Sequence, residues 1–121
     1  MTSPEQRGAP RAERSLIARY RALESEAGPW FISPLKDVSL KGARFLTECE
    51  FKPGSRLVLH VALPSSREPR VLCATVNRIR LAADALWEVG VEFEALQPED
   101  RRCLQEAVER VLRLRRRASD A

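Results

Sequence analysis

Two small groups of polar residues have the types and spacing that suit binding of a nucleotide-like anion. Asp37, Ser39 and Gly42 follow one another closely, and Arg7 and Arg11 stand four positions apart upstream. A carboxylate accepts hydrogen bonds from N–H groups on a purine edge, and arginine pairs bidentately with guanine O6 and N7 or with phosphate. Ser39 adds a small donor, and a glycine lets the backbone approach a flat ligand closely. A ligand with both a guanine and a phosphate would satisfy all of these groups.

Each group alone also has an ordinary structural explanation. Asp37 and Ser39 can cap a turn between strands with their side chains, and the two arginines can belong to a solvated terminal segment. Residues 12–36, 25 in all, separate the groups and contain two expected strands joined by one loop. A hairpin brings its ends together, so the segment before Leu16 is expected beside the end of the second strand. This proximity favours a single site made of both groups.

Short alternating apolar runs between turn residues predict a small antiparallel barrel or sandwich. Pro34 makes the second run an edge strand or a bulged one, because proline cannot donate a hydrogen bond to a neighbouring strand. Trp30, Trp87 and Phe93 are expected in the core, since they fall on the apolar faces of their strands. The six expected strands span residues 16–23, 30–37, 43–47, 57–63, 71–80 and 87–93.

The apolar residues change to a helical period after Pro98, which suits the first position of a helix. Arginines crowd residues 110–117 and are interpreted as a solvated helix end, with nucleic-acid binding through them as a weaker alternative. We therefore expect an all-β domain with one terminal helix, a six-stranded antiparallel β-barrel followed by a C-terminal α-helix. Its parts are a flexible arm over residues 1–13, the barrel over 14–96, the helix over 97–117 and a tail over 118–121.

The composition is that of an ordinary globular protein, with 121 residues, of which 44% are hydrophobic and 31% charged. No apolar run approaches the roughly 18 residues that cross a bilayer, and the N-terminus lacks the apolar stretch of a secretory signal. We therefore expect a cytoplasmic protein that does not insert into membranes.

The sequence has no catalytic pattern such as a nucleophile elbow, a pair of histidines or a glycine-rich phosphate loop. The single histidine, His60, lies in an alternating apolar run and is assigned a structural role. Cys49, Cys73 and Cys103 have no metal-ligand spacing and are expected to be reduced. The chain is therefore predicted to be a binding protein rather than an enzyme, with no metal and no cofactor.

The two polar groups resemble the signature of the PilZ family, the bacterial receptors for cyclic di-GMP, which is RxxxR followed at a similar gap by (D/N)xSxxG. Arg7-Gly8-Ala9-Pro10-Arg11 matches the first half, and Asp37-Val38-Ser39-Leu40-Lys41-Gly42 matches the second. Gly90-Val91-Glu92-Phe93 resembles the closing strand of the family, and Pro98-Glu99-Asp100-Arg101 resembles the start of its helix. The likeness extends over roughly residues 7–110 and implies the same barrel and helix.

The resemblance also implies roles for individual residues. Arg7 and Arg11 would wrap around cyclic di-GMP and order the arm, while Asp37 and Ser39 would contact a guanine and Gly42 would shape the turn. Three further residues could also contact the ligand. Arg78 would offer a plane on which a base stacks, and Arg14 and Lys41 would contact phosphate.

The implied function is that of a regulatory receptor, which passes the signal to an unidentified effector protein in motility or biofilm control. Some members of the family keep the fold without the ligand, so a ligand-independent adaptor for motility or secretion machinery is the alternative. Gln6 stands where many relatives carry another arginine, which removes one contact. Nucleic acid is not expected as a partner.

Overall fold

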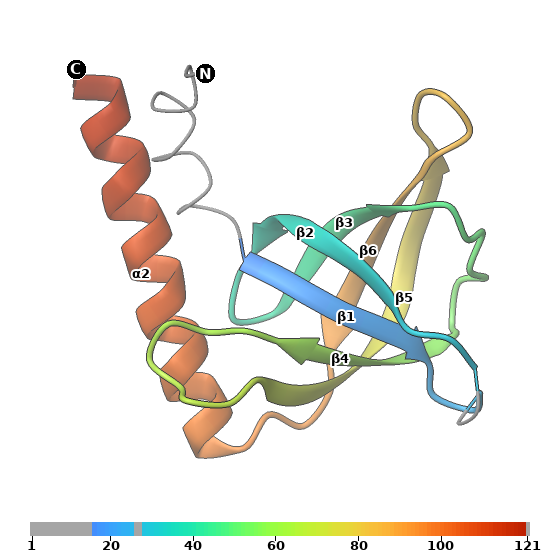
Figure 1. Ribbon diagram of the computed structural model, residues 1–121, viewed down its shortest axis with the longest axis horizontal. Helices are drawn as coiled ribbons and strands as arrows, with labels where there is room; N and C mark the ends of the chain where they lie inside the picture. Colours follow the sequence, from blue (N-terminus) through green and yellow to red (C-terminus); the bar gives the residue numbers. More distant parts are fainter. Residues whose placement is uncertain (1–15, 26–27, 121) are drawn as a thin grey trace.

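The computed structural model describes residues 16–25 and 28–120, with side chains as far as Arg113. Arg7, Arg11 and Arg14, and with them the expected arm over residues 1–13, lie outside the described residues. The elements are, in chain order, β1 (Leu16–Ala22), β2 (Phe31–Val38), β3 (Gly42–Thr47), β4 (Arg56–Val61), β5 (Arg70–Leu81), β6 (Trp87–Phe93) and α2 (Pro98–Asp120) (Figure 1).

The six strands form a closed antiparallel barrel in the order β1-β2-β3-β6-β5-β4. Apart from one irregular point each in β2 and β5, alternate residues of the strands point inward, as their apolar periodicity requires, and fill the barrel. The rings of Tyr20 and Phe45, for example, lie 4.5 Å apart at the centre of this core. The expectation of a six-stranded antiparallel barrel with a C-terminal helix is therefore confirmed.

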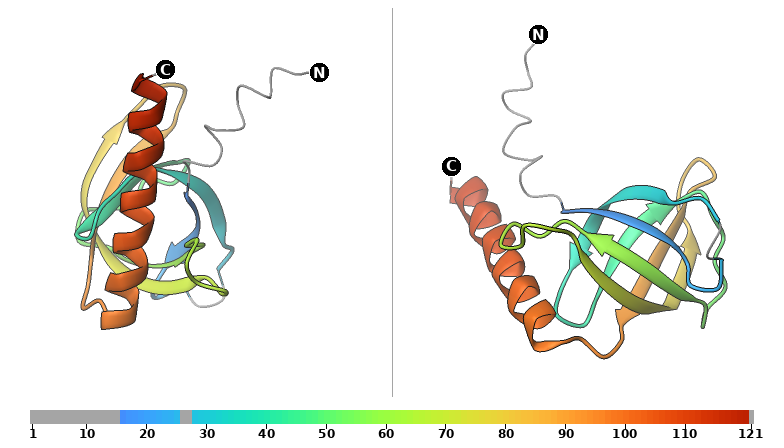
Figure 2. Two further views of the ribbon diagram at one scale, coloured as in Figure 1. Left: turned by 90° about the vertical axis from the view of Figure 1, so that its left-hand side faces the viewer. Right: turned by 60° about the horizontal axis from the view of Figure 1, so that its bottom comes forward.

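Helix α2 closes one end of the barrel, as the two views of Figure 2 show. Cys103, Leu104 and Ala107 form a buried stripe that joins the barrel core. An ion pair between Arg70 Nη2 and Asp100 Oδ1, at 2.7 Å, ties the first turn of the helix to the start of β5. The helix continues to Asp120 instead of ending at residue 117, because residues 118–120 contain no glycine or proline to stop it.

No helix among the described residues is both long enough and apolar enough to span a membrane. The three cysteines are free, with Cys103 buried and the other two partly buried.

Strand β2 is bulged but is not an edge strand. It pairs with β1 on one side and with β3 on the other, so the edge-strand alternative for Pro34 is wrong. The pairing with β3 shifts register between Leu35 and Asp37. The extra residue breaks the alternation of the strand, and Lys36 and Asp37 are both exposed. Without it, Asp37 would point into the barrel like Leu35.

Strand β5 contains a second irregularity of the same kind. Its pairing with β6 shifts between Val76 and Arg78, and Asn77 and Arg78 are both exposed as a result. The two bulges lie on opposite borders of the same part of the barrel surface, which consists of β2, β3, β6 and β5.

The aromatic residues divide between the core and the outer wall. Trp87 and Phe93 are partly buried and pack against the core, as expected. The expectation for Trp30 is wrong, because this side chain lies on the outside of the barrel between Arg19 and Arg21. It precedes β2 rather than belonging to it, so the inward alternation of the strand does not reach it.

Candidate ligand-binding site

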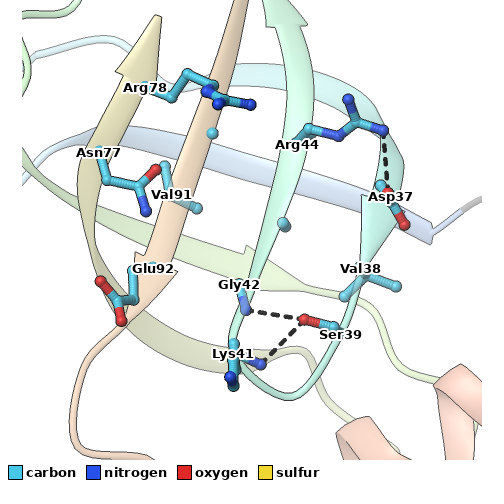
Figure 3. Close-up of a pocket in the computed structure, with 12 residues that line it drawn as sticks. Asp37, Val38, Ser39, Lys41, Gly42, Arg44, Asn77, Arg78, Val91 and Glu92 are labelled. Atoms are coloured by element: carbon cyan, nitrogen blue, oxygen red, sulfur yellow. Dashed lines mark hydrogen bonds and ion pairs between the residues drawn. The ribbon is translucent and has the colours of Figure 1, made fainter.

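A hollow of about 500 Å³ lies on the outer surface of β2, β3, β6 and β5 (Figure 3). Its centre is Gly90, which pairs with Arg44 on one side and with Arg78 on the other. With no side chain at Gly90, the space between the two arginines stays open. The lining residues are Asp37, Val38, Ser39, Lys41, Gly42, Ala43, Arg44, Asn77, Arg78, Gly90, Val91 and Glu92.

The open space at Gly90 is not a requirement of the fold. A Cβ at this position would meet the Oδ1 atom of Asn77 at 3.4 Å and the Cβ atom of Arg78 at 3.5 Å, which are ordinary contacts. An alanine or a β-branched residue would suit a strand better than glycine does. The glycine therefore has one clear consequence here, which is to keep the hollow open.

Gly42, in contrast, is a requirement of the fold. A Cβ on Gly42 would lie 1.9 Å from the carbonyl oxygen of Val91, far closer than van der Waals contact allows. The glycine is needed because the backbones of the paired strands β3 and β6 come very close at this point, and this contact accounts for it without any ligand. The sequence pattern placed the glycine correctly but gave a different reason for it, the approach of a flat ligand.

Ser39 holds the turn between β2 and β3 at the edge of the hollow. Its Oγ atom accepts hydrogen bonds from the backbone N–H groups of Lys41 at 3.1 Å and Gly42 at 3.3 Å. Its own backbone N–H donates to the carbonyl oxygen of Gly42 at 2.8 Å. The ordinary explanation, a turn capped by a side chain, therefore applies to Ser39, whose hydroxyl proton is left to donate elsewhere.

The acidic and basic groups of the site form a connected row across the barrel wall. Arg44 lies between two carboxylates, with Nη2 at 3.0 Å from Asp37 Oδ2 and Nη1 at 3.3 Å from Glu88 Oε2. The side chain of Glu88 is only 5% exposed and also pairs with Lys36 Nζ at 3.2 Å and with Arg80 Nη2 at 2.5 Å. These contacts hold the guanidinium of Arg44 in one place beside the hollow.

Arg78 makes no ion pair with any of the described residues, although it lies in the same wall. Its side chain points towards the strand that carries Arg44, whose own guanidinium points away to Asp37, and Glu92 lies farther along β6 (Figure 3). An arginine without a carboxylate partner, next to an open space, is suited to bind a phosphate or to stack on a planar base.

Glu88 makes the stability of the fold depend on pH in a way that can be tested. The hydrogen bond from Lys36, followed by that from Arg80, lowers the pKa of Glu88 below the ordinary value of 4.5. A carboxylate with a lowered pKa stabilises the fold fully above the unfolded pKa, and this stabilisation is lost as pH falls through the folded pKa. We expect Glu88→Gln to lower the melting temperature at pH 7 and to reduce its dependence on pH below about 4.5.

Thermal melts between pH 7 and pH 3 measure this effect. Glu106→Gln is the matched control, since its carboxylate pairs with Arg102 on the exposed surface of α2. Equal acid dependence of the Glu88→Gln variant and the wild type would contradict the assigned role.

The structure brings together five of the residues that the sequence singled out. Asp37, Ser39, Lys41, Gly42 and Arg78 all line the hollow. The upstream arginines are not described, but Leu16 pairs with Leu35, so the chain enters β1 beside the Asp37 end of β2.

Sequence reasoning missed Arg44, Asn77, Gly90 and Glu92. Arg44 was recognisable as the next outward position after Gly42 on the same strand. Asn77 followed by Arg78 interrupts an apolar alternation, which is the usual sign of a bulge. Among residues 16–25 and 28–120, no group of three or more histidine, cysteine or acidic side chains is placed to bind a metal ion.

The sequence model of the PilZ domain family matches residues 5–110, and the chain belongs to this family. No curated protein sequence matches the chain significantly.

Solved structures with the same fold include the PilZ domain of YcgR from Escherichia coli with c-di-GMP. It is 18% identical with a TM-score of 0.65, and the match covers 88% of both chains. The Bacillus subtilis inhibitor of motility MotI/DgrA is 20% identical with a TM-score of 0.64 over 82% of this chain and 48% of that one. The K. pneumonia MrkH–c-di-GMP complex is 13% identical with a TM-score of 0.66 over 85% and 49%. The chain thus spans about half the length of MotI and of MrkH, and at these identities the likeness establishes the fold.

Proposed function

We propose that this chain is a cyclic di-GMP receptor that binds its ligand in the hollow around Gly90. The observation that carries the proposal is the combination of Arg78, which has no carboxylate partner among the described residues, and the open space at Gly90. Ser39 and Gly42 are accounted for by the fold, and a ligand-free adaptor would need them equally. Arg78 and Gly90 have no such structural explanation.

The chemistry of the hollow suits a guanine nucleotide with a phosphate. Arg78 offers a flat cation to a base or to a phosphate, and Asp37 accepts hydrogen bonds from a guanine edge. Lys41 adds a positive charge at the turn. Family membership and the c-di-GMP complexes of the PilZ domain of YcgR and of MrkH support the same ligand. Arg7 and Arg11, which precede β1 in the sequence, are proposed to close over the ligand.

The proposed role is regulatory rather than catalytic. Binding would order the arginine-bearing segment at residues 1–13 and so change the surface that the protein presents to a separate effector protein. Ordering this segment costs conformational entropy, which the charge-assisted bonds of Arg7 and Arg11 must exceed. We place this activity in the cytoplasm, in control of motility or biofilm formation.

Filling the hollow tests the assignment directly. Gly90→Val is expected to weaken cyclic di-GMP binding by at least about 30-fold, because the added side chain occupies the space between Arg44 and Arg78. Its melting temperature should equal or exceed that of the wild type, since valine suits a strand better than glycine. Equilibrium dialysis with labelled cyclic di-GMP measures the affinity. Full affinity in a folded Gly90→Val variant would place the ligand elsewhere on the protein.

A further inference from the structure

A second exposed surface lies on the part of the barrel wall that the hollow does not use. Strand register places Ile32, Arg19, His60 and Val71 in one row across β2, β1, β4 and β5. Ile32 is 68% exposed and Val71 57% exposed, and Ile17 in the neighbouring row is 43% exposed. We call the surface formed by Ile17, Arg19, Arg21, Trp30, Ile32, His60 and Val71 the outer face. Strands β1, β2 and β4 form the near wall of the barrel in Figure 1.

The exposed aliphatic side chains are concentrated on the outer face. Three of the five large hydrophobic side chains that are exposed among the described residues belong to the outer face. Arg19 and His60 lie between Ile32 and Val71 in the row, so the outer face is a mixed apolar and basic surface, and arginine and aromatic residues are enriched at protein interfaces.

The arginines of the outer face are held in position by Trp30. The Cζ atoms of Arg19 and Arg21 lie 4.9 Å and 4.4 Å from the centroid of the Trp30 ring, and the ring of His60 lies 4.5 Å from it. Cation–π contact of this kind fixes a guanidinium in one plane. Arg21 Nη1 donates to the carbonyl oxygen of Gly28 at 3.4 Å, whereas the guanidinium of Arg19 makes no hydrogen bond with a described residue and can bind an acceptor. Tryptophan and arginine are also the residue types that contribute most energy at protein interfaces.

Among the described residues, the outer face carries positive charge without a matching negative charge. Neither β1 nor β4, its two central strands, contains an acidic residue. Neither Arg19 nor Arg21 forms an ion pair with a described residue. The pKa of His60 is lowered, first by burial and then by the charges of Arg19 and Arg21, as expected where positive charge is not neutralised. A complementary partner must therefore bring carboxylates.

We propose that the outer face is the docking surface for a partner protein whose contact surface combines aliphatic side chains with at least one Asp or Glu carboxylate. The carboxylate pairs with the guanidinium of Arg19, and the aliphatic side chains cover Ile32 and Val71. Bidentate arginine–carboxylate pairs supply the orientation, and the apolar contact supplies most of the affinity. This inference does not depend on which ligand the hollow binds.

Two other occupants fit the outer face less well. A symmetric dimer through this surface would bring the arginines of both copies together, and like charges in contact are unfavourable. An anionic membrane favours side chains that project and insert, whereas Trp30 is partly buried and the arginines lie against its ring.

The test uses two capped peptides and the 121-residue chain labelled with ¹⁵N. One peptide is Glu-Leu-Glu-Ile-Glu, and the other is its neutral counterpart Gln-Leu-Gln-Ile-Gln. We expect the acidic peptide to bind at least about 10-fold more tightly. Its addition should shift the amide signals of Arg19, Ile32 and His60 and the indole signal of Trp30.

Ile32→Ser and Arg19→Gln should each weaken binding of the acidic peptide about 5-fold or more. Leu81→Ser is the matched control, because Leu81 is 59% exposed and lies outside the outer face. Equal affinity for the two peptides, or shifts confined to other residues, would overturn the proposal. So would binding of the wild type to phosphatidylglycerol vesicles, or dimerisation in sedimentation experiments, if Ile32→Ser abolished either.

Discussion

The double substitution Arg7→Ala and Arg11→Ala is expected to weaken cyclic di-GMP binding by at least about 100-fold and to leave the melting temperature unchanged. Each charge-assisted hydrogen bond contributes about 1.5–3 kcal/mol, so losing two costs about 3 kcal/mol or more. Both residues precede the first strand, which begins at Leu16. Calorimetric titration measures the affinity, and circular dichroism follows the melting.

Arg67→Ala is the control for a general loss of positive charge, because Arg67 is exposed in the loop between β4 and β5. This variant should bind as the wild type does. Unchanged affinity in the Arg7 and Arg11 double variant would show that the upstream arginines take no part in binding. The hollow would then have to supply the whole site.

Gly42→Ala is expected to destabilise the fold by about 3 kcal/mol or more, which lowers the melting temperature of a domain of this size by at least about 12 °C. The reason is geometric, since the new Cβ would lie 1.9 Å from the carbonyl oxygen of Val91. The clash can be relieved only if β3 and β6 move apart, and the six-strand barrel depends on the pairing of these strands to remain closed.

Gly90→Ala is the matched comparison, because it makes the same chemical change on β6, the strand that pairs with β3. There the new Cβ makes only ordinary contacts, so we expect a melting temperature equal to or above that of the wild type. Thermal melts of the two variants side by side measure the difference. Similar stability of the two variants would show that the close approach at Gly42 can relax.

The arrangement of the elements was largely predictable from local sequence. The alternation of Trp87, Val89, Val91 and Phe93 gives β6 its observed limits, and Pro98 marks the first residue of α2. These signals are local, because a strand that covers a core must alternate and a proline suits the start of a helix.

The direction in which the site residues point was not predictable in the same way. Strict alternation would turn Asp37 inward with Leu35, and would turn Arg78 inward with Val76. The bulges in β2 and β5 reverse both, and a bulge depends on how two strands pair across the sheet rather than on either strand alone. The position of Trp30 was missed for a related reason, since it lies just outside the strand whose alternation was applied to it.

The hollow and the outer face occupy different parts of one barrel wall and share strands β2 and β5. The first is polar and open at Gly90, and the second is apolar and positively charged around Trp30. The proposed function would use both surfaces, the hollow for the ligand and the outer face for a partner protein.

A calorimetric titration of the wild-type chain with cyclic di-GMP, with GTP as the control for specificity, tests the proposed ligand. We expect saturable binding of cyclic di-GMP and no comparable binding of GTP. If the folded protein in the calorimeter gave neither binding heat nor saturation at high micromolar cyclic di-GMP, the proposed function would be contradicted.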